Sequence, residues 1–186
     1  MKWLIASDIH GSAYACRLLL ERYAAEGADR LLLLGDLLYH GPRNDLPREY
    51  APKQVIALLS SLAGDIFCVR GNCDAEVDQM VLPFSIRSDS LLLETVGRLV
   101  FATHGHLYGE QALPPLHEGD VLLTGHTHVP ACQEREGIFY LNPGSVSLPK
   151  EGSEAGYMTL EDGTFVFKTM QGREYSRFSL PPRTGK

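Results

Sequence analysis

The first half of the sequence alternates short apolar runs with longer stretches of helical pattern, and this alternation limits the possible folds more than any other feature. The apolar runs Lys2–Ser7, Leu31–Leu34 and Ile66–Arg70 have the length and composition of buried strands. Helical patterns fill the intervals at Ala13–Glu26 and Pro52–Ala63. Because strands that alternate with helices form parallel sheets, the pattern predicts an α/β arrangement in this half.

The second half of the sequence is dominated by strand patterns. One short helix is expected near Glu110–His117, and Asp162-Gly163 between two apolar runs is a strong hairpin signal. The chain of 186 residues has the size of one domain, which we expect to span residues 1–180, with a frayed tail at 181–186. The predicted strands of this half are Ser90–Val96, Leu99–Thr103, Val121–Thr124, Ile138–Leu141, Ala155–Leu160 and Thr164–Met170.

Composition excludes several classes of protein. No run approaches the roughly 18 apolar residues of a membrane span, and the apolar run Met1–Ala6 is too short for a signal peptide. Four cysteines without a C-x-x-C pair do not make a disulfide scaffold. A formal charge of −6 argues against a nucleic acid scaffold as partner. We therefore expect a cytoplasmic protein that binds neither a membrane nor a nucleic acid scaffold.

Five of the predicted strands end in side chains that can bind a metal ion. A lone Asp or His after a strand is usually a turn former, but turn chemistry does not explain five such endings in order, because turns rarely call for His. Ligand sites in parallel sheets lie beyond the carboxyl ends of the strands. The five endings are Asp8-Ile9-His10, Gly35-Asp36, Gly71-Asn72-Cys73-Asp74, Thr103-His104-Gly105-His106 and Gly125-His126-Thr127-His128.

The side chains at these endings predict a particular chemistry. Two carboxylates, one amide and several imidazoles suit Mn, Fe, Co, Mg or Zn better than they suit a closed structural zinc site. A carboxylate such as Asp36 has two oxygens and can bridge two ions. Two ions roughly 3.5–4 Å apart can hold a hydroxide between them and clamp a phosphate. The pattern therefore indicates a site that hydrolyses phosphoesters.

The order D-x-H, G-D, G-N-x-D, H-G-H, G-H-T-H resembles the calcineurin-like metallophosphoesterase superfamily, and the resemblance runs from about Lys2 to Met170. The short length and the G-N-C-D variant are similar to its compact bacterial phosphodiesterase branch, the YfcE type. The resemblance implies an α/β fold in which a two-sheet β sandwich is flanked by helices, in four αββα layers. It also implies that the later, β-rich half supplies the second sheet.

The resemblance further implies a ligand set and a reaction. One ion would be bound by Asp8, His10 and His128, a second ion by Asn72, His104 and His126, and Asp36 would bridge them. Each chain would hold two divalent ions, with Mn²⁺ favoured and Zn²⁺, Fe²⁺, Co²⁺, Ni²⁺ or Mg²⁺ as alternatives. The implied activity is hydrolysis of a small-molecule phosphodiester by attack of a hydroxide that the metals hold.

One position departs from the pattern of most relatives. They have His after the Gly-Asn, where it is thought to protonate the leaving group, and this chain has Cys73. A thiol with a pKa near 8.5 is a poor substitute for an imidazole in that role. General acid catalysis by a side chain is thus in doubt, which argues against a phosphomonoesterase or nucleotidase. A non-catalytic scaffold resembling the retromer subunit is the other alternative.

Residues near these endings are candidates for supporting roles. His40, Arg43 and Asn44 lie in the loop after Asp36, where they could contact a substrate phosphate, although an exposed solvated loop is the alternative. We expect His106 to orient a neighbouring ligand rather than to bind metal. Asp74 is expected to fix its loop by accepting backbone N–H bonds.

Overall fold

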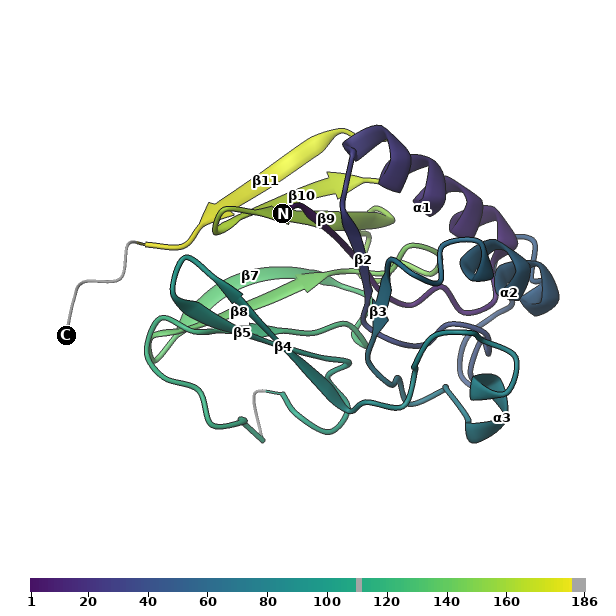
Figure 1. Cartoon of the computed structure of the whole chain (residues 1–186), viewed down its shortest axis with the longest axis horizontal. Coiled ribbons are helices and arrows are strands. Elements are labelled where there is room, and N and C mark those ends of the chain that lie inside the picture. Colours follow the sequence, from purple (N-terminus) through teal and green to yellow (C-terminus); the bar gives the residue numbers. More distant parts are fainter. Residues whose placement is uncertain (110–111, 182–186) are drawn as a thin grey trace.

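The chain folds into two β-sheets packed face to face, with helices on the outer face of the first sheet (Figure 1). The structure is a computed structural model that describes residues 1–109 and 112–181. This arrangement confirms the predicted sandwich of two sheets flanked by helices. Residues 182–186, most of the predicted tail, lie outside the described residues, as does Glu110.

The first sheet has six strands in the order β11-β10-β9-β1-β2-β3. β1, β2 and β3 are parallel, as the alternation with helices predicts, whereas β9, β10 and β11 continue the sheet antiparallel from β1. The later half of the chain therefore completes the first sheet as well as supplying the second. The strands are β1 (Trp3–Ala6), β2 (Arg30–Leu33), β3 (Ile66–Cys68), β9 (Gly156–Glu161), β10 (Thr164–Thr169) and β11 (Glu174–Ser179).

The second sheet has five strands in the order β4-β5-β6-β8-β7. β5, β6 and β8 are parallel, and the edge strands β4 and β7 pair antiparallel with their neighbours. The carboxyl ends of β5 and β6 thus lie at one edge of this sheet. The strands are β4 (Ser90–Thr95), β5 (Arg98–Thr103), β6 (Val121–Leu123), β7 (Pro130–Arg135) and β8 (Ile138–Pro143).

Three helices are present in the described residues: α1 (Ala13–Glu26), α2 (Pro52–Ser60) and α3 (Glu76–Gln79). α1 has the predicted bounds because the Ser12 hydroxyl accepts the Ala15 N–H at 3.1 Å at its start, and Gly27 adopts a left-handed conformation at its end. α2 begins at the predicted proline and gives way to turns after Ser60, so it is shorter than the predicted Pro52–Ala63. No helix of the described residues is long and apolar enough to cross a membrane.

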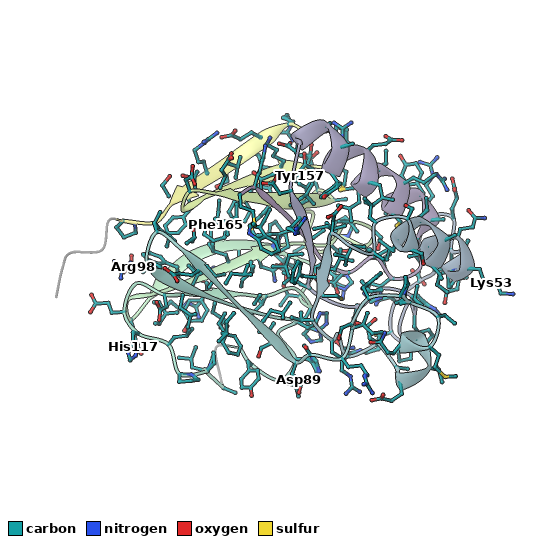
Figure 2. The ribbon with its side chains drawn as sticks, viewed as in Figure 1. Lys53, Asp89, Arg98, His117, Tyr157 and Phe165 are labelled. Carbon is teal, nitrogen blue, oxygen red and sulfur yellow. The ribbon has the colours of Figure 1, made fainter. Side chains whose placement is uncertain are left out.

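The first sheet has a layer of apolar side chains on each face. One layer packs against the helices and the other packs against the second sheet. In β2, Leu31 and Leu33 face α1 and α2, while Leu32 faces the second sheet. Phe165 of β10 is fully buried in the layer between the sheets (Figure 2). Strands buried on both faces need apolar residues at every position, which explains why β1 and β2 read as continuous apolar runs.

Besides the shorter α2, four elements differ from the prediction, and one of them is α3 (Glu76–Gln79), a single unpredicted turn of helix. β7 and β11 were not predicted, because they are exposed edge strands whose polar residues weaken the apolar pattern. The helix predicted near Glu110–His117 is wrong for residues 112–117, which form an irregular segment. Two prolines in a row, Pro114 and Pro115, disfavour a helix there. Leu116 from this segment instead packs against Phe101 on the outer face of the second sheet.

The carboxylate of Glu26 ties the end of α1 to the first sheet. It accepts hydrogen bonds from Lys168 at 2.7 Å, from Tyr157 at 2.8 Å and from Lys2 at 3.0 Å. Figure 2 shows Tyr157 in the sheet beneath α1. Burial alone would raise the pKa of Glu26, but the bonds from Lys168, Lys2 and Tyr157 outweigh burial and lower this pKa to about 2. The ionised carboxylate therefore stabilises the folded state.

Replacing Glu26 with Gln should lower the free energy of unfolding at pH 7 by about 2–3 kcal/mol. A carboxyl group whose pKa falls on folding stabilises the protein above its unfolded-state pKa, and this contribution is lost as the pH falls toward 2. The difference in the free energy of unfolding between the unchanged protein and the Glu26→Gln variant should therefore shrink below about pH 4.5. Urea unfolding at several pH values measures it. Glu21→Gln, on the exposed face of α1, should change stability by less than about 0.5 kcal/mol, and an equal loss in both variants would contradict the role of Glu26.

Candidate metal centre

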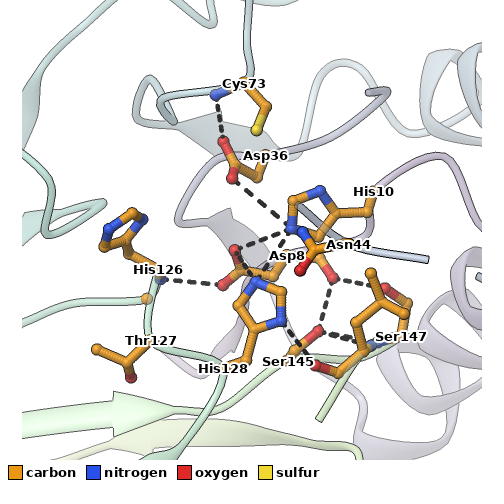
Figure 3. Close-up of polar contacts among 12 residues, drawn as sticks. Asp8, His10, Asp36, Asn44, Cys73, His126, Thr127, His128, Ser145 and Ser147 are labelled. Carbon is orange, nitrogen blue, oxygen red and sulfur yellow. Dashed lines mark hydrogen bonds and ion pairs between the residues drawn. The ribbon is translucent and has the colours of Figure 1, made fainter. Parts of the chain in front are cut away.

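The predicted ligands meet where the carboxyl ends of five parallel strands from both sheets come together (Figure 3). Asp8 and His10 follow β1, Asp36 follows β2, and Asn72 follows β3. From the second sheet, His104 follows β5, and both His126 and His128 follow β6. The fold thus brings together all seven positions that the sequence indicated.

The backbone at these strand ends is strained. Five of the seven residues have a positive φ, in the left-handed region that side chains other than glycine rarely adopt. Asp and His are among the residue types that tolerate this region best. Each such conformation costs of order 1–2 kcal/mol and persists only where the surroundings enforce it. The five residues are Asp8 (60°), His10 (50°), Asp36 (56°), His126 (66°) and His128 (63°).

Two glycines let the loops approach closely enough for the ligands to meet. A Cβ on Gly71 would lie 2.1 Å from Oδ1 of Asp36, and a Cβ on Gly125 would lie 1.9 Å from the hydroxyl oxygen of Ser7. Both distances are far inside van der Waals contact, so no side chain fits at either position. This contact explains why a glycine precedes Asn72 and His126 in the sequence.

Backbone carbonyls fix the orientation of three histidine rings. In each ring Nδ1 donates to a carbonyl, so in the neutral ring Nε2 carries the lone pair and points into the site. Such a carbonyl partner is the usual support of a histidine that binds metal. The carbonyls belong to Tyr39 for His10 at 2.7 Å, Leu34 for His104 at 2.6 Å and Leu148 for His128 at 2.6 Å.

One group of side chains converges around Asp8. Nε2 of His10 lies 3.1 Å from Nε2 of His128, and the two nitrogens lie 3.4 Å and 3.3 Å from Oδ1 of Asp8. Oδ1 of Asp8 is buried and makes no hydrogen bond within the described residues. Three electron-pair donors thus face one small volume.

A second group converges around His104. Its Nε2 lies 3.0 Å from Oδ1 of Asn72, 3.2 Å from Nδ1 of His126 and 3.4 Å from Oδ2 of Asp36. The same Oδ2 of Asp36 lies 3.6 Å from Nε2 of His10 in the first group. Oδ2 of Asp36 therefore lies between the two groups, within 3.6 Å of a histidine nitrogen of each.

The donor set fits a divalent metal ion. When the two rings are neutral, their Nε2 lone pairs lie 3.1 Å apart and repel each other, and the buried Oδ1 of Asp8 lacks a hydrogen-bond donor. A cation between these three atoms would remove both costs. His and carboxylate ligands with no thiolate requirement suit Mn, Fe, Co or Zn. Residues Asp8, His10 and His128 could hold one ion. Asp36 and His104 lie beside the space for a second ion.

The pKa values of residues in the cluster are shifted by burial and by the charged groups around them. Burial would raise the pKa of Asp8, but the neighbouring imidazoles of His10 and His128 outweigh burial and hold this pKa well below its usual range. Burial would also lower the pKa of His104, yet the hydrogen bond to Asp36 raises it to about 9. A cation that binds here must displace a proton from His104, because a metal ligand needs the neutral imidazole.

Asp74 holds the loops of the site together from behind. Its buried carboxylate accepts the backbone N–H groups of Gly71 and Asp36 at 2.8 Å and of Leu37 at 2.9 Å. The expected loop-fixing role of Asp74 is therefore confirmed. The bonds cross from the loop after β3 to the loop after β2, so Asp74 also sets the position of Asp36.

Two serines that the sequence analysis missed support Asp8. The hydroxyl groups of Ser145 and Ser147 donate to the carbonyl oxygen of Asp8 at 2.9 Å and 2.8 Å (Figure 3). These bonds stabilise the strained backbone of Asp8 from a segment more than 130 residues away. The sequence from Asn142 to Ser147 is typical of a turn, but nothing local to it indicates which residue its hydroxyl groups contact.

A small cavity opens over the ligands. Its lining includes His10, Asp36, Asn72, His126 and His128 together with Cys73 and residues of two loops. Of the three predicted substrate contacts, Arg43 and Asn44 line this cavity. His40 is absent from the lining, and its ring packs between Tyr39 and Tyr50 with centroids 4.7 Å and 5.2 Å away. Lys150, which the sequence analysis did not single out, also lines the cavity.

His106 and Cys73 stand beside the ligands. The ring of His106 lies 5.3 Å from that of His104, centroid to centroid, and does not line the cavity. Cys73 is half-buried on the cavity wall, and its sulfur accepts the side-chain N–H of Asn72 at 3.2 Å. Burial and the charge of Asp36 raise the pKa of the Cys73 thiol to about 12.

Comparisons with known proteins agree with this geometry. A family model described as the calcineurin-like phosphoesterase superfamily domain matches residues 1–163. The protein named phosphodiesterase YfcE in Escherichia coli K12 is 51% identical over 164 residues, which cover 87% of this chain and 88% of that protein. The probable metallophosphoesterase YsnB of Bacillus subtilis is 29% identical over 185 residues, which cover 94% of each chain.

Solved structures give the same result for the fold. The phosphoesterase YfcE from E. coli superposes with a TM-score of 0.93 at 44% identity and covers 97% of this chain and 100% of that chain. Vps29 from Entamoeba histolytica, solved as a complex with Zn²⁺, has a TM-score of 0.64 at 21% identity, with 97% of this chain and 100% of that chain covered. The second likeness shows the fold alone.

Replacing Asp36 with Asn should lower the metal content of the purified protein more than replacing His10 with Ala. Asp36 faces both ligand groups, whereas His10 belongs to one, so the lost charge affects both. We expect affinity for Mn²⁺ to fall by more than about 100-fold in Asp36→Asn. Elemental analysis and calorimetric titration measure the effect. Normal metal content in Asp36→Asn would show that the carboxylate does not bridge.

Proposed function

The chain belongs to the calcineurin-like phosphoesterase superfamily, and from this premise we propose that it hydrolyses a small-molecule phosphodiester with two divalent metal ions. The observation that carries the proposal is the convergence of two ligand groups on the shared carboxylate of Asp36. The 51% identity to a protein named phosphodiesterase supports the choice of a diester. Hydrolysis of phosphodiesters is thus the function that the site and the family support best.

Seven side chains would hold the ions. When bound, two divalent ions act as Lewis acids on the phosphate and activate water as a nucleophile, and Mn²⁺ is the ion we favour. The chain's own contribution is rigidity, since carbonyls orient three of the rings and Asp74 fixes the loop of Asp36. The proposed ligands are Asp8, His10 and His128 for one ion, Asn72, His104 and His126 for the other, and Asp36 for both.

Arg43 and Asn44 are proposed to position the substrate. Both line the cavity, and a guanidinium or an amide N–H can donate to anionic oxygens of the substrate. The side-chain amide of Asn44 also donates to the carbonyl of His40 at 2.8 Å, which fixes this loop. His40 would then act through the loop and not on the substrate.

Cys73 limits which esters the site can cleave. Its half-buried, neutral thiol has a pKa raised to about 12, so it is a weaker acid than an ordinary thiol. An alkoxide leaving group therefore receives little help from this side chain. Diesters with a leaving group that is stable without a proton suit such a site better than alkyl monoesters do.

The two alternatives lack a supporting observation. A phosphomonoesterase gains most from a proton donor, which Cys73 does not supply. A scaffold has no need of metal ligands, yet all seven ligand positions are filled and lie together. We further propose that the protein acts in the cytoplasm, because its four cysteines are free.

Removal of divalent metal should abolish phosphodiesterase activity. Exhaustive treatment with a chelator should lower kcat/KM on bis(p-nitrophenyl) phosphate to background, and added Mn²⁺ should restore it. Circular dichroism before and after treatment is the control for unfolding. Full activity in protein shown by elemental analysis to be free of metal would refute a metal-dependent reaction.

Replacing Cys73 with His should raise activity on alkyl esters and monoesters more than on aryl diesters. A general acid contributes about 10²–10⁴-fold where the leaving group needs a proton, and an aryloxide needs little. The measurement is kcat/KM on matched alkyl and aryl, mono- and diester substrates. Cys132→Ser, on the exposed strand β7, is the control and should change none of them.

An equal effect of Cys73→His on all four substrates would count against this account. So would a loss on all four with metal still bound. In either case Cys73 fills space beside the site, and the acid that relatives place there has no counterpart at this position.

A further inference from the structure

The cavity over the ligands is small and opens to solvent. The volume open to the centres of water molecules is about 50 Å³, which is room for roughly three to five waters. The ligands lie at its floor, where the scissile phosphate would bind. The alcohols of a diester would then extend toward the mouth of the cavity, and the side chains there can favour some alcohols over others.

Lys150 stands at that mouth on a backbone held at both ends. Its N–H donates to the carbonyl of His128 at 3.3 Å, and its carbonyl accepts the N–H and the hydroxyl of Ser153 at 3.0 Å and 2.7 Å. Two residues earlier, the carbonyl of Leu148 orients the ring of His128. The position of Lys150 is thus fixed relative to a proposed metal ligand.

Arg43 lies in another loop whose neighbouring residues are fixed beside the site. The carbonyl of Tyr39 orients His10, and the side chain of Asn44 closes the loop on the carbonyl of His40. Arg43 and Lys150 are both exposed and both line the cavity. Two cationic residues therefore border the cavity that contains the buried ligands.

Neither cation has an ion pair with another described residue, although the chain carries a net charge of −6. Elsewhere, Arg17 and Arg30 pair with Glu49 and Asp65. Two cations beside one cavity attract a further anion, because opposite charges near a desolvated site interact more strongly than in bulk water. The proposed metal ligands at the floor of the cavity already account for the binding of the scissile phosphate.

We propose that Lys150, together with Arg43, binds a second anionic group of the substrate, so that the preferred phosphodiester has an alcohol that carries a phosphate-like or carboxylate group. This inference rests on the proposed phosphodiesterase function. Lys150 acts as a point charge, and the guanidinium of Arg43 can bind an oxyanion through two N–H groups. Both residues determine specificity and take no part in bond cleavage.

Three p-nitrophenyl phosphodiesters that differ only in the second alcohol test the proposal. The alcohols are ethyl, 2-carboxyethyl and 2-phosphonoethyl, so the leaving group is constant. The Mn²⁺-loaded protein should have a kcat/KM on at least one anionic diester about tenfold or more above that on the ethyl diester. The anionic diester with the larger value identifies the second group as carboxylate or phosphate-like.

Variants locate the source of the preference. Lys150→Met and Arg43→Met should each lower the ratio of anionic to ethyl diester about tenfold, while Lys150→Arg should retain most of it. Lys53→Met removes an equal charge from the exposed face of α2, which points away from the molecule in Figure 2, and should leave the ratio unchanged. Thermal unfolding of each variant checks that it is folded.

The outcomes separate this inference from the proposed function. Hydrolysis of all three diesters at equal rates would overturn the inference and leave the phosphodiesterase intact. An unchanged ratio in both Lys150→Met and Arg43→Met, or an equal drop in Lys53→Met, would also overturn it. No hydrolysis of any diester by metal-loaded protein would contradict the proposed function itself.

Discussion

Two buried carboxylates, Asp8 and Asp36, impose the constraint on which the rest of the site depends. A buried carboxylate is costly unless a cation or several donors face it, and these two share one small volume. Imidazole nitrogens surround them, and backbone carbonyls hold three of the four rings, those of His10, His104 and His128, from behind. The left-handed backbone at Asp8 and Asp36 aims the carboxylates inward, and its strain is borne by hydrogen bonds from other loops. Bound cations would neutralise the buried carboxylates. Cation binding would therefore explain both the strained backbone and the high density of charge at the site.

The part of the site built from strand ends could be predicted from the sequence. Parallel strands meet at one edge, so polar residues that follow successive apolar runs must approach one another, and His at such positions is not explained by turns. The supporting residues could not be predicted in this way. Ser145 and Ser147 meet Asp8 because β9 pairs with β1 in the first sheet, and nothing local to either segment indicates that pairing. The position of Lys150 beside the site depends on the same long-range pairing, so it could not be predicted from local sequence either.

The fold shows the same division between local and long-range information. α1 and the central strands were predictable because caps and two-sided burial leave clear patterns in the sequence. β7 and β11 were not, because an edge strand buries little and can be polar along most of its length. The return of the last three strands to the first sheet has a functional consequence. It places β1 in the interior of that sheet, so Asp8 emerges where segments from both halves of the chain can hold it.

Charge alone does not explain a preference for diesters. Two dications against the carboxylates of Asp8 and Asp36 would leave the cluster with a net positive charge, and such a cluster attracts a monoester dianion at least as strongly as a diester monoanion. Selectivity must therefore come from residues outside the ligand set. Cys73 would disfavour alkoxide leaving groups, because its neutral thiol gives little help to an alkoxide. In our proposal Lys150 and Arg43 would bind the second alcohol, which a monoester lacks. The ligands would then make phosphate hydrolysis possible, and the residues around them would decide which phosphate ester is cleaved.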